Sequence, residues 1–395
     1  MGRIDAWLAW VALTLAAMHA LALQAPSTSP AAPDERTPRL IPRTPAEREQ
    51  RFVAQHRVSL NVRVADGSGK PVTELNQSDF SVYDNDKLRK LVSFRSVGGA
   101  AGGSHIILVI DAVNNFSKQV RTYAKEIERY LKEGNGPLAY PVALGVFSSI
   151  GIEVSQSWRD RALLLHELRA KAEDLRAGGC ITQQDHGNAT AAAYTLGGMG
   201  GTRTESQQEL ICKNERFVKS INALSELARK QMDVPGRVIL IWLGPGWPML
   251  TDKAFTPDPP DLKRSFFSQL VTLSMSLREA QVTLDAVGSP DESINPQTPN
   301  VRDSEFFGGV YGADQVSAAN FGLHVLAHQT GGRILTDTKD IASQISTCVA
   351  DGESYYVLTF DSPPAAGFGE YHSLAVKVNK PGLDVRTSTL YYAEQ

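Results

Sequence analysis

The run Asp111-Ala-Val-Asn-Asn115 offers the most suggestive group of chemically capable side chains, because it follows five apolar residues, 106–110. These five residues show no alternation and are mostly β-branched, which predicts a strand buried on both faces. Asp111 would then lie at the carboxyl end of a central strand, the edge where open α/β sheets bind their ligands. The alternative is structural: Asp111, helped by Asn114, Asn115 and Ser117, would cap the helix that follows.

Other groups of reactive residues lack part of the pattern that their chemistry requires. His324 and His328 are four residues apart, as in a helical metal pair, but no Glu lies between them and no third ligand is evident. No Gly-x-Ser-x-Gly elbow occurs, so a serine hydrolase on an α/β sheet lacks its usual signature. The glycine run 197–201 follows no predicted strand and opens no helix, which indicates a loop and not a phosphate cradle. The sequence therefore predicts no catalytic residue.

The elements that must position Asp111 follow from the hydrophobic pattern. Strands and helices alternate through residues 104–351, which predicts an α/β fold with a doubly wound, mostly parallel sheet. Alternating patterns flank this region, and we expect the two flanks, 56–98 and 353–394, to form one small β-sandwich. Residues 385–392 read as one strand of that unit, and residues 316–328 read as one helix of the α/β region.

The start of the chain resembles a secretory signal peptide. Arg3, an apolar run at 6–17 and the small residues of Ala20-Leu-Ala22 place this segment at 1–22, with an uncleaved anchor as the alternative. Proline-rich residues 23–55 cannot bury a core and predict a disordered tether. The net charge is −3, which does not favour nucleic-acid binding, and no later stretch could cross a membrane. We expect a secreted, periplasmic or cell-envelope protein.

The three cysteines fit this compartment, because export permits disulfides. Cys180 and Cys212 lie at the two ends of one polar, glycine-rich insertion, and we predict that they form a disulfide that closes it. The alternative is a pair of free thiols. Cys348 falls on the apolar stripe of a predicted helix, which indicates a buried thiol.

Seven short stretches, in this order, also resemble a known family. The α/β region is similar to a von Willebrand factor A domain, and residues 57–394 resemble the von Willebrand factor A-related proteins frequent in Acidobacteria. The stretches are residues 64–72, 79–83, 106–114, 235–243, 280–287, 330–334 and 355–358.

The resemblance implies a metal site at the carboxyl edge of the sheet. Such a site uses Asp-x-Ser-x-Ser after the first strand and an Asp after the fourth, an oxygen set that suits Mg²⁺ or Ca²⁺. Here Asp111 holds the first position, but Val113 and Asn115 replace the serines, and Gly244 follows the later strand. We therefore expect a degenerate site with Asp111 and Asn115 as its remaining ligands, and no cofactor.

Long loops are expected near this edge, at 178–208, 244–260 and 288–312, and they carry large apolar side chains. Exposed aromatic residues on loops are typical of protein-binding surfaces, although such side chains also fold back onto their own loops. The loops also carry Met249, and the predicted partner-binding face consists of Asn114, Trp247, Phe255, Phe306, Phe307 and Tyr311.

Together these patterns predict an exported, non-enzymatic protein-interaction module. It would bind a cell-envelope or secreted protein through the carboxyl-edge loops without a metal. One alternative is a divergent adhesion domain that binds Mg²⁺ or Ca²⁺ through Asp111. Another is a hydrolase whose site has no recognised motif. The pattern says nothing about the oligomeric state.

Overall fold

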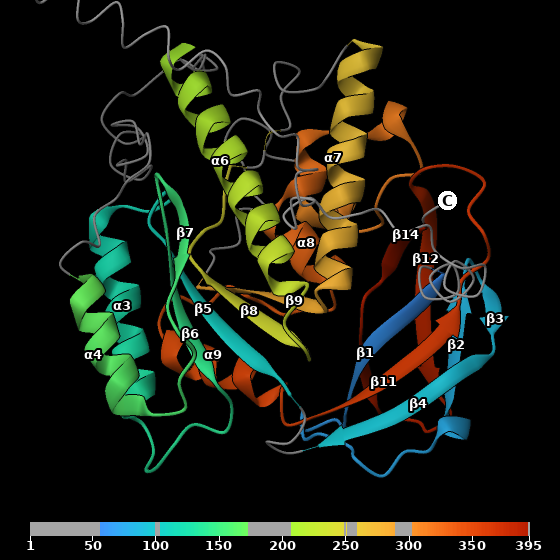
Figure 1. Ribbon diagram of the computed structural model, residues 1–395, viewed down its shortest axis with the longest axis horizontal. Helices are drawn as coiled ribbons and strands as arrows, with labels where there is room; N and C mark the ends of the chain where they lie inside the picture. The colour runs from blue at the N-terminus through green and yellow to red at the C-terminus, as the bar shows by residue number, and fades with distance from the viewer. Residues whose placement is uncertain are drawn as a thin grey trace, which may run out of the picture. The chain divides into compact units, whose positions relative to one another are not determined.

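A computed structural model describes most of the chain that follows the predicted tether (Figure 1). The described residues are 56–98, 103–172, 207–248, 250, 259–288 and 302–393. The predicted signal segment and tether lie outside them, as do Cys180, Met249 and Phe255. None of the helices within the described ranges is both long and apolar enough to cross a membrane.

A six-stranded sheet forms the centre of the α/β region, and its strand order is β10-β9-β8-β5-β6-β7. Five strands are parallel and the edge strand β7 is antiparallel, so the expected mostly parallel sheet is present. The strands are β5 (His105–Asp111), β6 (Val142–Ser148), β7 (Gly151–Val154), β8 (Val238–Leu243), β9 (Val282–Val287) and β10 (Ile334–Leu335). All six residues of β8 are buried, as its continuous apolar run predicts, and all six of β9 are buried as well, including Thr283 and Asp285.

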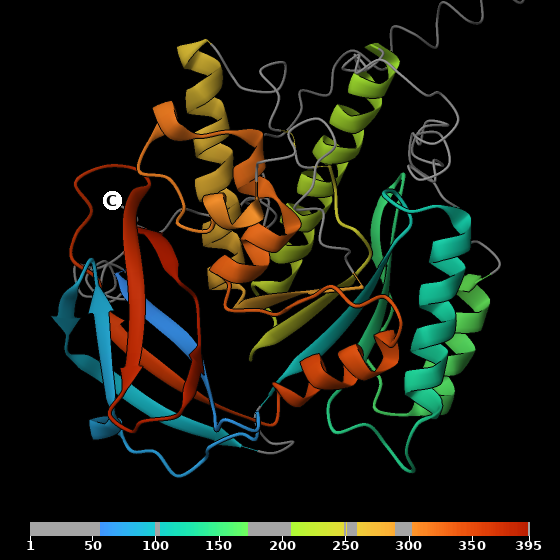
Figure 2. The ribbon, with the colours of Figure 1, turned by 180° about the vertical axis from the view of Figure 1, so that it is seen from behind.

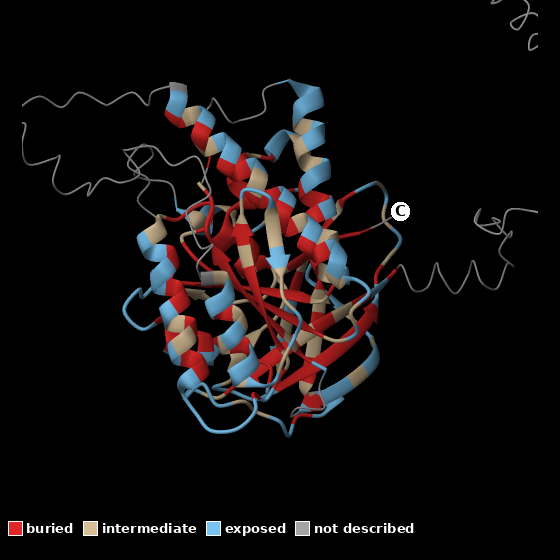
Figure 3. Ribbon diagram, turned by 60° about the vertical axis from the view of Figure 1, so that its left-hand side comes forward, coloured by how far each residue is buried: buried red, intermediate tan, exposed pale blue. Residues whose placement is uncertain are grey.

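Helices cover both faces of this sheet (Figures 1 and 2). One hydrophobic cluster joins the sheet to α3 (Ser117–Lys132), α4 (Arg161–Ala172) and α9 (Ile341–Ala350). The opposite cluster joins it to α6 (Gln207–Gln231), α7 (Pro260–Glu279) and α8 (Leu323–Gln329). Alternate residues of β5 enter the two clusters, so the central strand is sealed from water on both sides (Figure 3).

The helix expected at 316–328 is broken into shorter pieces. Its first part forms two 3-10 turns, η5 (Ala313–Gln315) and η6 (Ala318–Phe321), and α8 begins only at Leu323. Ser317 and Asn320 bond each other locally, because the Ser317 backbone N–H donates to Asn320 Oδ1 at 2.8 Å. Side chains that bond their own backbone in this way compete with a continuous helix.

Two four-stranded antiparallel sheets combine the N-terminal and C-terminal segments, with strand orders β13-β1-β11-β4 and β14-β12-β2-β3. One hydrophobic cluster takes side chains from both sheets, which is the arrangement by which thin sheets bury apolar surface. The strands are β1 (Arg57–Ala65), β2 (Phe80–Asp84), β3 (Lys87–Arg89), β4 (Leu91–Gly98), β11 (Ser354–Asp361), β12 (Glu370–Val378), β13 (Asp384–Arg386) and β14 (Leu390–Ala393). We call these eight strands the β region.

The strand expected at 385–392 is in fact two strands that belong to different sheets. β13 pairs with β1, whereas β14 pairs with β12. Residues 387–389 connect them and contact the α/β region, where the Thr389 N–H donates to the Gln329 carbonyl at 3.1 Å. The sequence pattern did not reveal this change of sheet, because no Gly or Pro separates the two halves.

Asp351, directly after α9, joins the β region to the amino edge of the central sheet. Its carboxylate contacts Arg63 at 2.5 Å, receives two bonds from Arg333 at 2.8 and 2.9 Å, and pairs with Arg386. Its backbone carbonyl accepts a bond from Arg237 at 3.1 Å. Four guanidinium groups from separate segments therefore meet at one buried residue.

Candidate functional site

The Asp111 carboxylate lies at the carboxyl edge of the central sheet, where the sequence places it. The residue is fully buried, and its two oxygens accept four hydrogen bonds from N–H groups. Oδ1 accepts from the backbone of Val113 at 3.0 Å and of Asn114 at 2.8 Å. Oδ2 accepts from Asn114 Nδ2 at 2.9 Å and from Trp242 Nε1 at 3.1 Å. All four of these donors are uncharged.

The pKa of Asp111 reflects this environment. Burial raises it to about 6, while the bonds from Asn114, Trp242 and Val113 act in the opposite direction and favour the carboxylate. At neutral pH the group is therefore ionised, and neutral dipoles stabilise its charge. An aspartate that lies at a ligand-binding edge with a raised pKa is a candidate functional group, but a satisfied structural carboxylate has the same signature.

The residues around Asp111 do not fit the hard-cation site that the family resemblance implies. Val113 is completely buried and offers only methyl groups. Asn115 Nδ2 donates to the Asp111 backbone carbonyl at 2.8 Å. A Cβ atom on Gly244 would lie 2.7 Å from Asn115 Nδ2 and 2.8 Å from Asp111 Cβ, so an aspartate has no room there. Among the described residues, no group of three or more His, Cys, Asp or Glu side chains could hold a metal ion.

The helix-capping interpretation of Asp111 also needs correction. α3 begins at Ser117, and its N-cap residue is Phe116, whose side chain makes no capping hydrogen bond. Asp111 instead fixes the loop before the helix, because it accepts the backbone N–H groups two and three residues later. Asx residues commonly organise turns by bonds of this kind.

Two residues of the predicted partner-binding face belong to the core. Asn114 is buried and its Nδ2 also donates to Ser220 Oγ of α6 at 3.1 Å. Trp247 is only 4% exposed, donates its indole N–H to the Phe321 carbonyl at 2.8 Å, and packs edge-on against Trp242 at 5.5 Å. The loop after β8 thus turns its tryptophan inward, because the indole finds both an apolar environment and an acceptor there.

The other aromatic residues of that face differ in exposure. Phe306 and Phe307 are half-buried, and Phe307 stacks on the ring of His328 with centroids 4.1 Å apart. Tyr311 is 70% exposed, although its ring packs against Tyr371 of β12 with the two ring centroids 4.3 Å apart. Tyr311 is therefore the member of the described set whose surface is open to a partner.

The cysteines differ in the way that the sequence predicts. Cys212 is buried on α6 and is disulfide-bonded, whereas Cys348 is a buried free thiol. Cys180 lies outside the described residues, as does Phe255, so the Cys180–Cys212 pairing remains a prediction. Burial raises the pKa of the Cys348 thiol, which keeps it protonated and unreactive.

Exposed apolar side chains that the loop-based reasoning missed lie on two of the long helices. Ile211 and Val218 of α6 are 52% and 44% exposed, and Leu262 of α7 is 45% exposed. The N-terminal halves of both helices lie toward the carboxyl edge, since each helix leads into the start of a parallel strand. Ile211 and Val218 are seven residues apart and therefore share a helix face. They lie on two separate helices whose N-terminal ends diverge (Figure 1), and we call these three exposed side chains together the α6–α7 surface.

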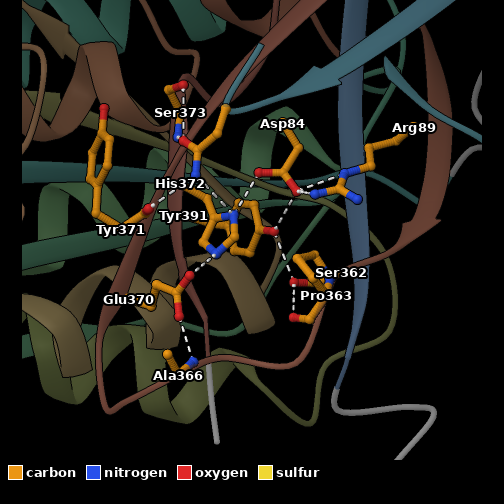
Figure 4. A network of polar contacts seen from close by, with 11 residues as sticks. Asp84, Arg89, Ser362, Pro363, Ala366, Glu370, Tyr371, His372, Ser373 and Tyr391 are labelled. Carbon is orange, nitrogen blue, oxygen red and sulfur yellow. Dashed lines mark hydrogen bonds and ion pairs between the residues drawn. The ribbon is translucent and has the colours of Figure 1, made fainter. Parts of the chain in front are cut away.

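A second cluster of titratable groups lies in the β region (Figure 4). Asp84, fully buried at the end of β2, contacts His372 Nδ1 at 2.6 Å and Arg89 Nη2 at 2.7 Å. The hydroxyl of Tyr391 donates to the same carboxylate at 3.3 Å, and its ring stacks on the imidazole at 4.6 Å. Burial opposes ionisation of Asp84, but His372 and Arg89 together outweigh it and lower its pKa.

This Asp–His pair is not arranged as a hydrolase triad. The second imidazole nitrogen of His372 lies 3.5 Å from a Glu370 oxygen, and the imidazole is almost completely buried. The Ser362 hydroxyl contacts the Tyr391 hydroxyl at 2.8 Å instead of the histidine. No sequence motif could have indicated this cluster, because Asp84 and His372 are 288 residues apart.

Comparisons with known proteins complete the description of the site. No family model matches the sequence, and no curated protein matches it. Among solved structures, an aerotolerance-related membrane protein from Bacteroides fragilis is 9% identical, with a TM-score of 0.29 over 62% of this chain and 96% of that one. Manganese-loaded TRAP protein from Plasmodium vivax is 7% identical, with a TM-score of 0.33 over 78% and 97%.

A third similar structure is the proximal thread matrix protein from mussel byssus whose MIDAS motif is occupied by zinc. It is 12% identical, with a TM-score of 0.32 over 67% of this chain and 49% of that one. The chain thus spans about half the length of that protein. All three similarities are low in identity and in TM-score, and we base no functional argument on them.

Proposed function

We propose that this chain is a non-enzymatic protein-interaction module with a von Willebrand factor A-like α/β region, and that it works without a metal. The observation that carries the proposal is the saturation of Asp111 by four neutral N–H donors. A carboxylate whose lone pairs are all used by its own chain has none left for a cation or a substrate. Gly244 and Asn115 occupy the space around it.

We also propose that the protein is exported and that its partner is a secreted or cell-envelope protein. The signal-like segment 1–22 and the disulfide-bonded Cys212 both support an oxidising compartment. The α6–α7 surface and Tyr311 provide the contact, because exposed aliphatic and aromatic side chains are what the cores of interfaces bury. These side chains take the place of Asn114 and Trp247 in the proposed partner-binding face, because those two residues are buried.

A metal titration tests the metal-independent mechanism. An ion that binds the folded chain would stabilise it by mass action and raise its melting temperature. Because we propose that no ion binds, we expect the melting temperature to stay unchanged when Mg²⁺ or Ca²⁺ is added to millimolar concentration. A saturable rise in melting temperature that Asp111→Asn abolishes would establish the divergent metal-dependent adhesion domain instead. The same rise in both proteins would show ion binding at some other place.

A pull-down tests the partner and the surface. The bait is the mature chain, presented to the secreted and envelope proteins of the source organism with and without EDTA. We expect capture that survives EDTA and that weakens in the double variant Ile211→Ser/Leu262→Ser. The matched control is Ile150→Ser, which removes an isoleucine that is 80% exposed in the β6–β7 turn. Capture that EDTA abolishes would contradict the proposal.

A further inference from the structure

His372 lies between two carboxylates of the β region, with one carboxylate at each nitrogen of its imidazole (Figure 4). Its Nδ1 is 2.6 Å from Asp84 Oδ1, and its Nε2 is 3.5 Å from Glu370 Oε1. A neutral imidazole has one N–H and one lone pair, so it can donate to only one of the two carboxylates. Only the imidazolium donates at both nitrogens, so both contacts are made only when His372 is charged.

The charges around the imidazole balance only when His372 is protonated. Asp84 and Glu370 supply two negative charges, and Arg89, whose Nη2 is 2.7 Å from Asp84 Oδ2, supplies one positive charge. Tyr391 stacks on the imidazole at 4.6 Å between ring centroids and stays uncharged, because burial raises its pKa. Loss of the imidazole proton would leave one net negative charge in a group whose Asp84 and His372 side chains are almost completely buried.

Glu370 connects this imidazole to the loop 362–369, which joins β11 to β12. One carboxylate oxygen of Glu370 faces His372, and the other, Oε2, accepts the backbone N–H of Ala366 at 2.5 Å. Two residues of the loop are prolines, which have no N–H to donate. The Glu370 side chain therefore makes a contact that fixes the middle of the loop.

The end of the loop packs on α7. Gly369 is buried, and a Cβ atom there would lie 2.8 Å from Val271 and 3.2 Å from Phe267, so the loop backbone lies directly against the helix. Phe368, the residue before it, is 55% exposed. Release of the loop would therefore open this contact with α7 and free Phe368 to move.

The start of the loop is held by groups that do not change charge near neutral pH. The backbone N–H of Ser362 donates to the backbone carbonyl of His56 at 2.7 Å, and a carbonyl does not titrate. The Ser362 hydroxyl contacts the hydroxyl of Tyr391 at 2.8 Å. A change of pH should therefore act on the middle of the loop, through Glu370, and not on its start.

We propose that His372 and Glu370 form a pH-dependent latch that holds the loop 362–369 against α7. At mildly acid pH the imidazolium donates from Nε2 to Glu370, and Glu370 holds Ala366. When Nε2 loses its proton its lone pair faces the carboxylate, the contact becomes repulsive, and the loop is released. The contact between Nδ1 and Asp84 persists, because Nδ1 keeps its N–H. The latch thus stabilises the loop in acid and loses this effect as the pH rises. It does not rest on the function proposed above.

Hydrogen–deuterium exchange of the full chain tests this latch. Mass spectrometry of a peptide that covers residues 362–369, corrected for the intrinsic exchange rate at each pH, measures how often the loop opens. We expect its protection to fall about fivefold between about pH 5.5 and about pH 8.5, a range that spans the titration of histidine. Constant protection of this loop would overturn the proposal.

The internal reference is the turn 66–70, which a carboxylate also holds. Asp66 Oδ1 accepts the backbone N–H groups of Ser68 at 2.9 Å and of Lys70 at 3.0 Å, and neither partner is a histidine. Protection of this turn should not depend on pH once the intrinsic rate is corrected. An equal fall in both segments would overturn the proposal, because it would show a general loss of structure.

Glu370→Gln tests the carboxylate. Glutamine keeps an acceptor for the Ala366 N–H but has no charge for an imidazolium to bind, so protection of the loop should no longer depend on pH. The matched control is Asp79→Asn, which also neutralises a carboxylate that accepts a backbone N–H, from Asn76 at 2.8 Å. Asp79 lies before β2, at the opposite end of that strand from Asp84, and this variant should keep the fall. A pH dependence that survives Glu370→Gln would contradict the latch.

His372→Gln tests the imidazole. Glutamine cannot gain a proton, so at about pH 5.5 the loop should be about fivefold less protected than in the native chain, with no further fall at higher pH. Native protection in this variant at acid pH would overturn the proposal. The Glu370→Gln comparison does not depend on this variant. Failure of the latch leaves the α6–α7 surface untouched, because the pull-down depends on Ile211 and Leu262.

Discussion

Asp111 and Asp351 are both buried, and they lie at opposite edges of the same parallel sheet, but their partners differ in charge. Asp111 accepts four bonds from neutral N–H groups, and burial raises its pKa to about 6. Burial acts on Asp351 in the same direction, but Arg333 and Arg386 outweigh it and lower the pKa. The pKa values of these two buried aspartates are therefore shifted in opposite directions, and the charge of the hydrogen-bond partners decides the direction.

The contrast also separates two structural roles. The bonds of Asp111 stay within one loop and the adjacent strand β8, so this aspartate shapes the carboxyl edge locally. The bonds of Asp351 reach Arg63 of β1 and Arg386 of β13, so it joins the β region to the α/β region. The four-arginine cluster around Asp351 thus lies at the edge opposite the one where such sheets usually bind ligands.

The largest effect is expected from Asp351→Asn. The change leaves Arg63, Arg333 and Arg386 without the carboxylate that they share, and stranded buried charges cost about 3–5 kcal/mol. Urea unfolding followed by circular dichroism measures this loss. The control is Asp361→Asn, which removes one exposed partner of Arg57 and should cost at most about 1 kcal/mol. Equal losses in the two variants would contradict the assigned role of Asp351.

Asp111→Ala should have the next largest effect, about 3 kcal/mol at pH 7. It removes the acceptor of four N–H groups, and buried donors without an acceptor are costly. Asp111→Asn should lose less, because its carbonyl can still accept the two backbone bonds while its amide faces the donors of Asn114 and Trp242. Urea unfolding again measures both variants. If Asp111→Ala is as stable as the native chain, the carboxylate is not a structural acceptor.

The two aspartates should respond to pH with opposite signs. The pKa of Asp111 is raised, so its contribution to stability is fully present below pH 4 and is lost as the pH rises through about 6. The change is at most about 3 kcal/mol, and buried Asp285, with a pKa also near 6, acts in the same direction. The pKa of Asp351 is lowered, so this residue contributes stability at pH values above the ordinary pKa of an aspartate. That stability is lost as the pH falls into the acid range.

Unfolding free energies of the native chain and of Asp111→Asn between pH 4 and pH 8 test this difference. The native chain should lose stability relative to the variant as the pH rises through 6, because only the native chain must ionise a buried carboxyl there. A constant difference over this range would mean that Asp111 titrates alike in the folded and unfolded chain.

The smallest effect concerns a single donor. Trp242→Phe removes one bond to Asp111 and should cost about 1–2 kcal/mol at pH 7, and less at pH 5, where the carboxyl is mostly protonated. Trp247→Phe is the matched control, because it removes an indole bond to the uncharged carbonyl of Phe321. Its cost should not change over the same range. Parallel pH profiles for the two variants would contradict the assigned bond.

The strands of the fold were largely predictable from the sequence, because hydrophobic pattern and burial coincide. The unbroken apolar runs of β5 and β8 are buried on both faces, and the alternation of β1 directs every second side chain into the core. The pattern failed at 316–328 and at 385–392. At 316–328 a local hydrogen bond between Ser317 and Asn320 interrupts the predicted helix. At 385–392 a change of sheet divides the predicted strand into two.

The candidate site was less predictable, because its properties depend on partners that are distant in the chain. Asp111 was correctly placed at the sheet edge, but its bond to Trp242 joins residues 131 positions apart. Trp247 was expected at the surface because loops usually lie there, yet an inward turn gives its indole an acceptor. The pair of Asp84 and His372 carries no local signal at all.

The interleaving of early and late strands has a consequence for the order of folding. Among the described residues β1 pairs with β11 and β13 alone, and β2 has only the three-residue strand β3 beside it until β12 is made. These early strands therefore lack most of their sheet neighbours until about three hundred further residues exist. During that interval their apolar faces are open to wrong partners. A nascent chain of this protein therefore depends on protection until its last forty residues emerge, and a version cut off before β11 would be a substrate for proteolysis however well its central sheet formed.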